Sequence, residues 1–219
     1  MLLIEYLQAN PLIALGATFV FGLLVGSFLN VVIYRLPVMM ERRWRREWQA
    51  IEAAEAVGPG APPPELPPEP RFDLMVPRSA CPHCGTQIAA WQNIPVVSWL
   101  ILRGRCAACA APIAARYPLI ELLTGVLSGV MIWQLGWGPG GWVGLGFLWA
   151  LIALTFIDFD HQLLPDDITY PLLWAGLGLS AIDSTLNLSA PLPVPDLPAA
   201  VIGAILGYLS LWLVYWLFK

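Results

Sequence analysis

The sequence predicts an all-α polytopic membrane protein with about five transmembrane helices and one large cytoplasmic loop after the first. Its 219 residues are 58% hydrophobic and only 12% charged, whereas roughly 25% of a soluble domain is charged. Uncharged runs at several places exceed the roughly 20 residues that cross a bilayer. Ten of the 11 Lys and Arg residues lie between Arg35 and Arg116, which marks this segment as the cytoplasmic one.

The first transmembrane helix is expected in an N-terminal region, residues 1–37. Leu12 to Ile33 is a run of 22 residues without a charge. It is too long for the core of a signal peptide and no small-residue cleavage site follows it, so we expect a retained span. Asn30 lies inside this run and therefore needs a polar partner within the membrane.

The cytoplasmic loop, residues 38–118, divides into three parts. Val38–Val57 has a helical pattern with Trp44 and Trp48 on one stripe. This helix either lies on the membrane surface or extends into solvent beside the first span. Residues 58–70 contain seven prolines in 13 positions, which is typical of a semi-rigid spacer.

The third part of the loop, residues 78–113, contains all four cysteines of the chain. Cys81 and Cys84 form one Cys-x-x-Cys pair, and Cys106 and Cys109 form another after 21 intervening residues. This spacing is close to that of tetrahedral four-cysteine zinc sites. A shell of four thiolates leaves no open position for water, so the zinc would be structural. Redox-active or metal-free thiols are the alternative, and disulfides are disfavoured in the reducing cytosol.

Residues 119–219 are expected to be the transmembrane domain. Leu122–Ile157 is an uncharged run of 36 residues that Gly138–Gly141 interrupts, which predicts two spans joined by a turn. Ile168–Ile182 is a shorter apolar segment, and Leu197–Phe218 is another full-length span.

The connection after the third span is the most acidic part of the membrane domain. It places Asp158, Asp160, Asp166, Asp167 and His161 between apolar segments. Counting spans from the basic loop puts this connection on the cytoplasmic face. Acids beside hydrocarbon are costly and usually serve a site. The alternatives are that one of the later aspartates caps the next helix, and that the first is satisfied by water at the membrane boundary.

Four segments, taken in order, resemble the type IV prepilin peptidase family, the bifunctional leader peptidases and N-methyltransferases of type IV pilus and type II secretion systems. They are GSFLNVVIYRLP at Gly26–Pro37, the two Cys-x-x-Cys pairs, RYPLIELLTG at Arg116–Gly125 and IDFDHQLLPDDIT at Ile157–Thr169. The resemblance covers nearly the whole chain. It implies a membrane aspartyl protease of the bacterial inner membrane whose partners are prepilins, pseudopilins and the lipid bilayer, with no nucleic acid.

The resemblance also implies which residues act. Asp158 takes the place of the first catalytic aspartate, and the second belongs to a Gly-x-Gly-Asp motif after a later span. That motif is absent from the 219 residues, so we expect a truncated chain that is inactive by itself. The methyl donor of the family is S-adenosylmethionine. No glycine-rich nucleotide loop marks its site, and the cytoplasmic loop is a weak candidate.

Two other functions remain open from the sequence. The first is a non-enzymatic membrane scaffold whose zinc-binding loop recruits a partner. The second is a transporter that uses Asp158 and Glu121 as intramembrane acids. Glu121 has a structural alternative of its own, because an acid near the start of a helix interacts favourably with the helix dipole.

Overall fold

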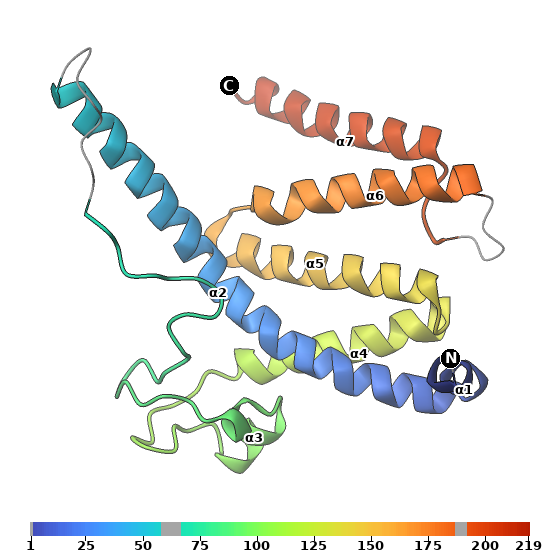
Figure 1. Cartoon of the computed structure of the whole chain (residues 1–219), viewed down its shortest axis with the longest axis horizontal. Coiled ribbons are helices and arrows are strands. Elements are labelled where there is room, and N and C mark those ends of the chain that lie inside the picture. The colour runs from blue at the N-terminus through green and yellow to red at the C-terminus, as the bar shows by residue number, and fades with distance from the viewer. Residues whose placement is uncertain (1, 58–66, 187–191) are drawn as a thin grey trace. The chain divides into compact units, whose positions relative to one another are not determined.

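The computed structural model describes residues 2–57, 67–186 and 192–219, and this part of the chain is α-helical without a β-strand. Figure 1 shows the order of the helices. The elements are α1 (Leu2–Ala9), α2 (Pro11–Val57), the 3₁₀ helix η1 (Ala90–Asn93), α3 (Val97–Ile101), α4 (Arg116–Leu135), α5 (Pro139–His161), α6 (Asp166–Leu186) and α7 (Leu197–Leu217). The predicted fold class is therefore confirmed.

Within the described residues, four helices are long and apolar enough to cross a membrane: α2, α4, α5 and α7. A break separates α4 from α5 as predicted, but it comprises residues 136–138 rather than Gly138–Gly141, because α5 already begins at Pro139. Gly136 begins the break with φ 76°. Its N–H bonds the Ile132 carbonyl at 2.9 Å, as in a helix that ends on a left-handed glycine. The fourth of the five predicted spans, Ile168–Ile182, lies in α6, which carries three acids and is not among these four helices. That α6 crosses the membrane stays a prediction.

Helix α2 joins two elements that the sequence presents separately. The first span and the predicted loop helix form one helix of 47 residues with Pro37 inside it. At 1.5 Å per residue such a helix is about 70 Å long, more than twice the roughly 30 Å apolar layer of a bilayer. Its C-terminal part, with exposed Trp44 and Trp48, therefore extends beyond that layer. Most of the predicted proline spacer, residues 58–66, lies outside the described residues.

The chain folds into two compact units. The first comprises Met1–Gly22, Thr124–Ile152 and Leu164–Lys219, and the second comprises Leu23–Leu123 and Ala153–Leu163.

Close helix packing organises the first unit. A Cβ placed on Gly22 of α2 would lie 2.7 Å from the Ser128 hydroxyl oxygen and 2.9 Å from Gly125 Cα, both on α4. Trp149 of α5 donates a hydrogen bond to the same Ser128 oxygen at 3.0 Å. Small residues thus bring α2 and α4 together, as they commonly do in membrane proteins. Helices α6 and α7 pack against each other in this unit.

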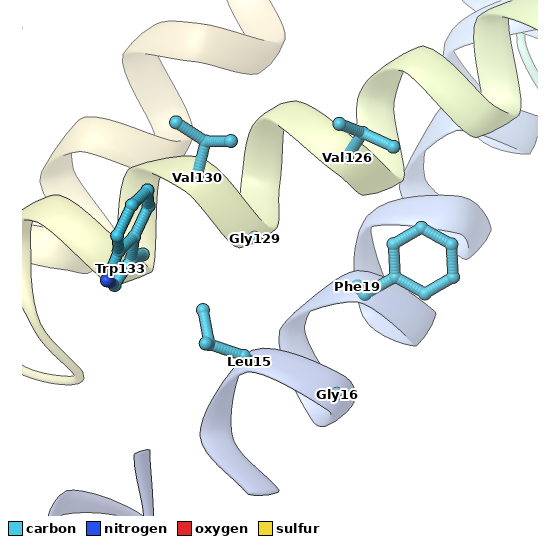
Figure 2. Close-up of a pocket in the computed structure, with 7 residues that line it drawn as sticks. All are labelled: Leu15, Gly16, Phe19, Val126, Gly129, Val130 and Trp133. Atoms are coloured by element: carbon cyan, nitrogen blue, oxygen red, sulfur yellow. The ribbon is translucent and has the colours of Figure 1, made fainter. Parts of the chain in front are cut away.

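An apolar cleft of about 420 Å³ lies between α2 and α4 in the first unit (Figure 2). Its lining consists of Leu15, Gly16, Phe19, Val126, Gly129, Val130 and Trp133. These side chains supply no acid, base or nucleophile, so the cleft is not a candidate for chemistry.

In the second unit, Arg35 attaches the cytoplasmic loop to α2. Its side chain is buried and donates hydrogen bonds to the carbonyls of Asp73 at 2.8 Å and Pro77 at 2.6 Å. Two guanidinium groups make cation–π contacts with the Phe72 ring. The guanidinium carbon lies 5.6 Å from the ring centroid for Arg35 and 4.2 Å for Arg42. These contacts explain why the chain returns to α2 immediately after the proline-rich segment.

Candidate functional site

The four cysteines lie on two short loops of the same design. In the first loop the Gly85 N–H bonds the Cys81 carbonyl, and in the second the Ala110 N–H bonds the Cys106 carbonyl, both at 2.9 Å. Gly85 and Ala110 both have positive φ, 70° and 57°, which turns each loop back on itself. The repeated turn aims both cysteines of each pair at one point.

The cysteine cluster has the dimensions of a metal site. All four Sγ atoms lie within 4.8 Å of one another, and those of Cys81 and Cys109 are 3.8 Å apart. A tetrahedral shell with zinc–sulfur distances of about 2.3 Å places its sulfurs about 3.8 Å apart. The Thr86 hydroxyl and backbone N–H lower the pKa of the Cys84 thiol to about 6, whereas burial and the neighbouring cysteines raise the pKa of the Cys109 thiol to about 11. The distances between the sulfurs, and not these pKa values, indicate the metal site. The four residues can therefore hold a metal ion.

Glu121 attaches the segment between the two cysteine pairs to the helices. Its carboxylate is buried and accepts the Val96 N–H at 2.7 Å, together with a hydrogen bond from Ser27 of α2. Val96 has φ 61°, an unusual value for a β-branched residue. Such a backbone persists only where its surroundings fix it, and the Glu121 carboxylate supplies that restraint. Besides the two predicted alternatives for Glu121, an acid of the site or a charge at a helix start, the structure therefore indicates a third role: it holds the segment between the two cysteine pairs.

The predicted acidic connection begins in the last turn of α5. Asp160 accepts a bidentate pair of hydrogen bonds from Arg116, with Nη1–Oδ1 at 2.7 Å and Nη2–Oδ2 at 2.5 Å. The Arg116 guanidinium also lies 5.4 Å from the centre of the Phe156 ring. The negative charge of Asp160 is therefore already matched by a cation.

Asp158 lies in the same turn but in a different environment. Its side chain is exposed, and among the described residues none donates a hydrogen bond to its carboxylate. Its backbone carbonyl accepts the Gln162 N–H at 2.8 Å, and Gln162 ends the helix with φ 51°. His161 is exposed, as expected. Asp158 is thus an accessible carboxylate on a fixed turn.

All four sequence segments that carry the resemblance place residues in the second unit. Asn30 donates to the Tyr117 carbonyl at 3.1 Å, which is the partner that an intramembrane Asn requires. Arg116 joins the start of α4 to the end of α5 through Asp160.

The other predicted acids, Asp166 and Asp167, belong to the first unit. They lie in the first turn of α6, where negative charge interacts favourably with the helix dipole. Asp166 accepts a hydrogen bond from the Thr169 hydroxyl at 3.4 Å. The prediction that one of these aspartates caps α6 stays a prediction.

The sequence reasoning did not anticipate Arg116 as a partner of Asp160 or Val96 as a strained residue. A signal existed for the first, since Arg116 is the only basic residue at the start of the second span and an acid-rich helix end needs a cation. Nothing in the sequence marks the backbone angle of Val96.

Several candidate membrane spans, with polar residues gathered at helix ends and a four-cysteine cluster in a loop, define a polytopic helical membrane protein with a metal-binding loop. Family comparison identifies the particular family: residues 20–135 match the bacterial peptidase A24 N-terminal domain, and residues 145–219 match the type IV leader peptidase family. The chain belongs to the type IV leader peptidase family.

Curated relatives share about half of the residues. A protein of Stutzerimonas stutzeri is 49% identical over 219 residues, covering 99% of this chain and 68% of its own length. Proteins of Aeromonas hydrophila and Pseudomonas aeruginosa are 47% and 48% identical, covering 100% and 99% of this chain and 69% of their own lengths. All three are named prepilin leader peptidase/N-methyltransferase. No solved structure matches the chain significantly.

Proposed function

We propose that the protein cleaves the leader peptide of prepilins and pseudopilins and methylates the new N-terminus, with Asp158 as a catalytic carboxylate of the cleavage. The observation that carries the assignment is the contrast within one helical turn. Asp160 is paired with Arg116, whereas Asp158 is exposed and available to a substrate. The family membership and the names of the relatives support the reaction.

The proposed cleavage needs two carboxylates that share one proton. The ionised carboxylate takes a proton from water as the water oxygen attacks the scissile carbonyl carbon. The protonated one hydrogen-bonds the carbonyl oxygen, and after collapse of the tetrahedral intermediate the amine leaves with a proton. Two neighbouring carboxylates titrate as a coupled pair, because like charges so close together do not both ionise easily and one proton is shared. We assign one role of this pair to Asp158, and the second carboxylate is expected from a Gly-x-Gly-Asp motif.

We propose that the metal of the cysteine cluster is zinc and that its role is structural. A zinc ion bound by Cys81, Cys84, Cys106 and Cys109 would be held by four thiolates with no position for water. When bound, zinc would cross-link the Cys81–Cys84 loop to the Cys106–Cys109 loop and would take no part in bond breaking. Folding of such small modules is commonly coupled to the metal.

The methyl donor implied by the methyltransferase activity is S-adenosylmethionine. The described residues offer no clear fit for it, because they contain no glycine-rich nucleotide loop of the usual kind and the cleft of the first unit is lined by apolar side chains. We therefore assign no residue to the donor. We place both Asp158 and the cysteine cluster on the cytoplasmic side of the inner membrane, as the distribution of basic residues favours.

The test is a prepilin cleavage assay in membranes that contain the Asp158→Asn or the Asp196→Asn variant. The assay uses the 219-residue chain and a form in which the C-terminal segment of the Stutzerimonas stutzeri relative follows Lys219. In whichever form cleaves, Asp158→Asn should reduce the rate by about 10²–10⁴-fold, the usual effect of removing a proton-transfer group. Asp196 is also exposed and precedes α7 without a side-chain capping bond, so its variant should cleave normally. Full activity of Asp158→Asn would refute the assignment.

A further inference from the structure

Arg116 holds one face of the turn that carries Asp158. It bonds Asp160 through both terminal nitrogens, and its guanidinium lies over the Phe156 ring. Phe156 and Asp160 are four residues apart, so they are neighbours on the same face of α5. One cation therefore contacts two successive positions of this helical face.

Asp158 lies on the other side of the same turn. Each residue of an α-helix turns the direction of the side chain by about 100°, so Asp158 is about 200° from both Phe156 and Asp160. Arg116 therefore holds the rotation of this turn about the helix axis through the Phe156/Asp160 face, and it does not cover the Asp158 carboxylate on the opposite face. The Gln162 N–H, which bonds the Asp158 carbonyl at 2.8 Å, holds the backbone at the same place.

Arg116 is itself held in place. It is the first residue of α4, and the carbonyl of the next residue, Tyr117, accepts a hydrogen bond from Asn30 of α2 at 3.1 Å. The guanidinium thus links the end of α5 to two other helices. A planar guanidinium makes a paired contact with a carboxylate that a lysine cannot reproduce.

The pairing also has an electrostatic consequence. The C-terminal end of a helix carries partial negative charge, and α5 places two aspartates in its last turn. Arg116 neutralises Asp160 and leaves Asp158 as the unmatched acid of that turn. The side chains of Arg116 and Asp160 are 40% and 24% exposed, so solvent screens this pair less than it screens a fully exposed one.

We propose that Arg116 is a positioning residue for the peptidase reaction, which acts through Asp160 and Phe156 to orient the turn that presents Asp158. The inference rests on the proposed function of Asp158. A displacement of about 1 Å in a reacting group costs up to about 100-fold in rate, so loss of this contact should lower kcat rather than weaken substrate binding.

The test is a double-mutant cycle on prepilin cleavage by the form that cleaves. It compares Arg116→Gln, Asp160→Asn, the double variant and Arg116→Lys. We expect each single variant to lower kcat by about 10- to 100-fold with KM within about twofold. The double variant should be no slower than Arg116→Gln, because both changes break one contact. Arg116→Lys should recover only part of the rate.

The matched control is Arg45→Gln, which breaks the exposed Arg45–Glu41 pair of 2.6 Å on α2 and should leave kcat unchanged. A normal kcat for Arg116→Gln, or the same loss in Arg45→Gln, would overturn the inference. A loss in Asp160→Asn far larger than that in Arg116→Gln would also overturn it, because Asp160 would then take part in the chemistry itself.

A second readout needs no activity and applies to the 219-residue chain. In an Asp158→Cys background, the alkylation rate of the new thiol by a charged maleimide is compared with and without Arg116→Gln, using peptide mapping by mass spectrometry. A rate change of at least about threefold is expected if Arg116 orients the turn, and equal rates contradict it. Normal cleavage by Asp158→Asn, by contrast, would reject the proposed function of Asp158 whatever the result at Arg116.

Discussion

Replacing Glu121 with alanine removes the acceptor that holds the segment between the two cysteine pairs. In the structure the buried Glu121 carboxylate accepts the Val96 N–H at 2.7 Å. Val96 is the residue before α3 and has φ 61°. Without the carboxylate, this N–H loses its partner and the strained backbone loses its restraint.

The size of the effect follows from the type of bond. A hydrogen bond to a charged group contributes about 1.5–3 kcal/mol, and each 1.4 kcal/mol is about a tenfold change in an equilibrium. The opening equilibrium at Val96 should therefore shift by roughly 10- to 100-fold toward the exchange-competent state. The change should be confined to the cysteine segment, because Glu121 contacts that segment and Ser27 of α2.

The assay is hydrogen–deuterium exchange of peptides that cover residues 94–101, followed by mass spectrometry. Glu121→Ala should exchange faster at Val96 by the factor above. Glu121→Gln is the control, because its neutral amide oxygen still accepts the N–H, and its exchange should lie between that of the unmodified protein and that of Glu121→Ala. Equal protection in Glu121→Ala would show that the Val96 backbone is fixed by something else and would refute the reasoning.

Three further predictions concern packing, metal and pH. Gly22→Ala should lower the unfolding midpoint in detergent, because its Cβ would lie 2.7 Å from the Ser128 hydroxyl oxygen and overpacking costs about 1–3 kcal/mol; Gly16→Ala, with no heavy atom within 4 Å, should not. A zinc chelator should remove roughly one metal ion per chain and make residues 78–113 sensitive to protease, and a metal-free protein with full resistance would contradict this. The backbone N–H groups of Met75 and Val76, together with the Arg71 side chain, hold the pKa of the Asp73 carboxyl below the ordinary 3.8. The Asp73–Val76 turn is therefore stabilised fully above pH 3.8, and it loses this contribution as pH falls through the lower pKa of the folded state. An NMR titration midpoint of Asp73 at or above 3.8 would refute this prediction.

The apolar runs predicted the membrane helices well, because in lipid both hydropathy and helix formation are imposed by the same absence of water. Two long helices joined by a short turn were expected in this region and are confirmed, although the turn lies at residues 136–138 instead of Gly138–Gly141. The continuity of α2 through Pro37 was not predicted. Proline usually ends a helix by loss of one hydrogen bond, and a sequence does not show when packing tolerates that loss.

The cysteine cluster could be predicted because its ligands are adjacent pairs with fixed spacing, and the structure brings all four together. The environment of Asp158 was harder to predict. Its neighbour Asp160 has the same chemistry two positions away, and only the contact with Arg116, 44 residues earlier in the chain, distinguishes them. Such long-range pairings depend on how helices pack, which local sequence patterns do not encode.

The most direct test of the account measures two activities of the Asp158→Asn variant, made in the form that cleaves, in one membrane preparation. One substrate is an uncleaved prepilin, and the other is a pilin whose leader has already been removed. If Asp158 is a catalytic carboxylate of cleavage alone, the variant should lose cleavage by about 10²–10⁴-fold and still methylate the processed pilin within about twofold of the unmodified protein. Cleavage at the normal rate by Asp158→Asn would contradict the account.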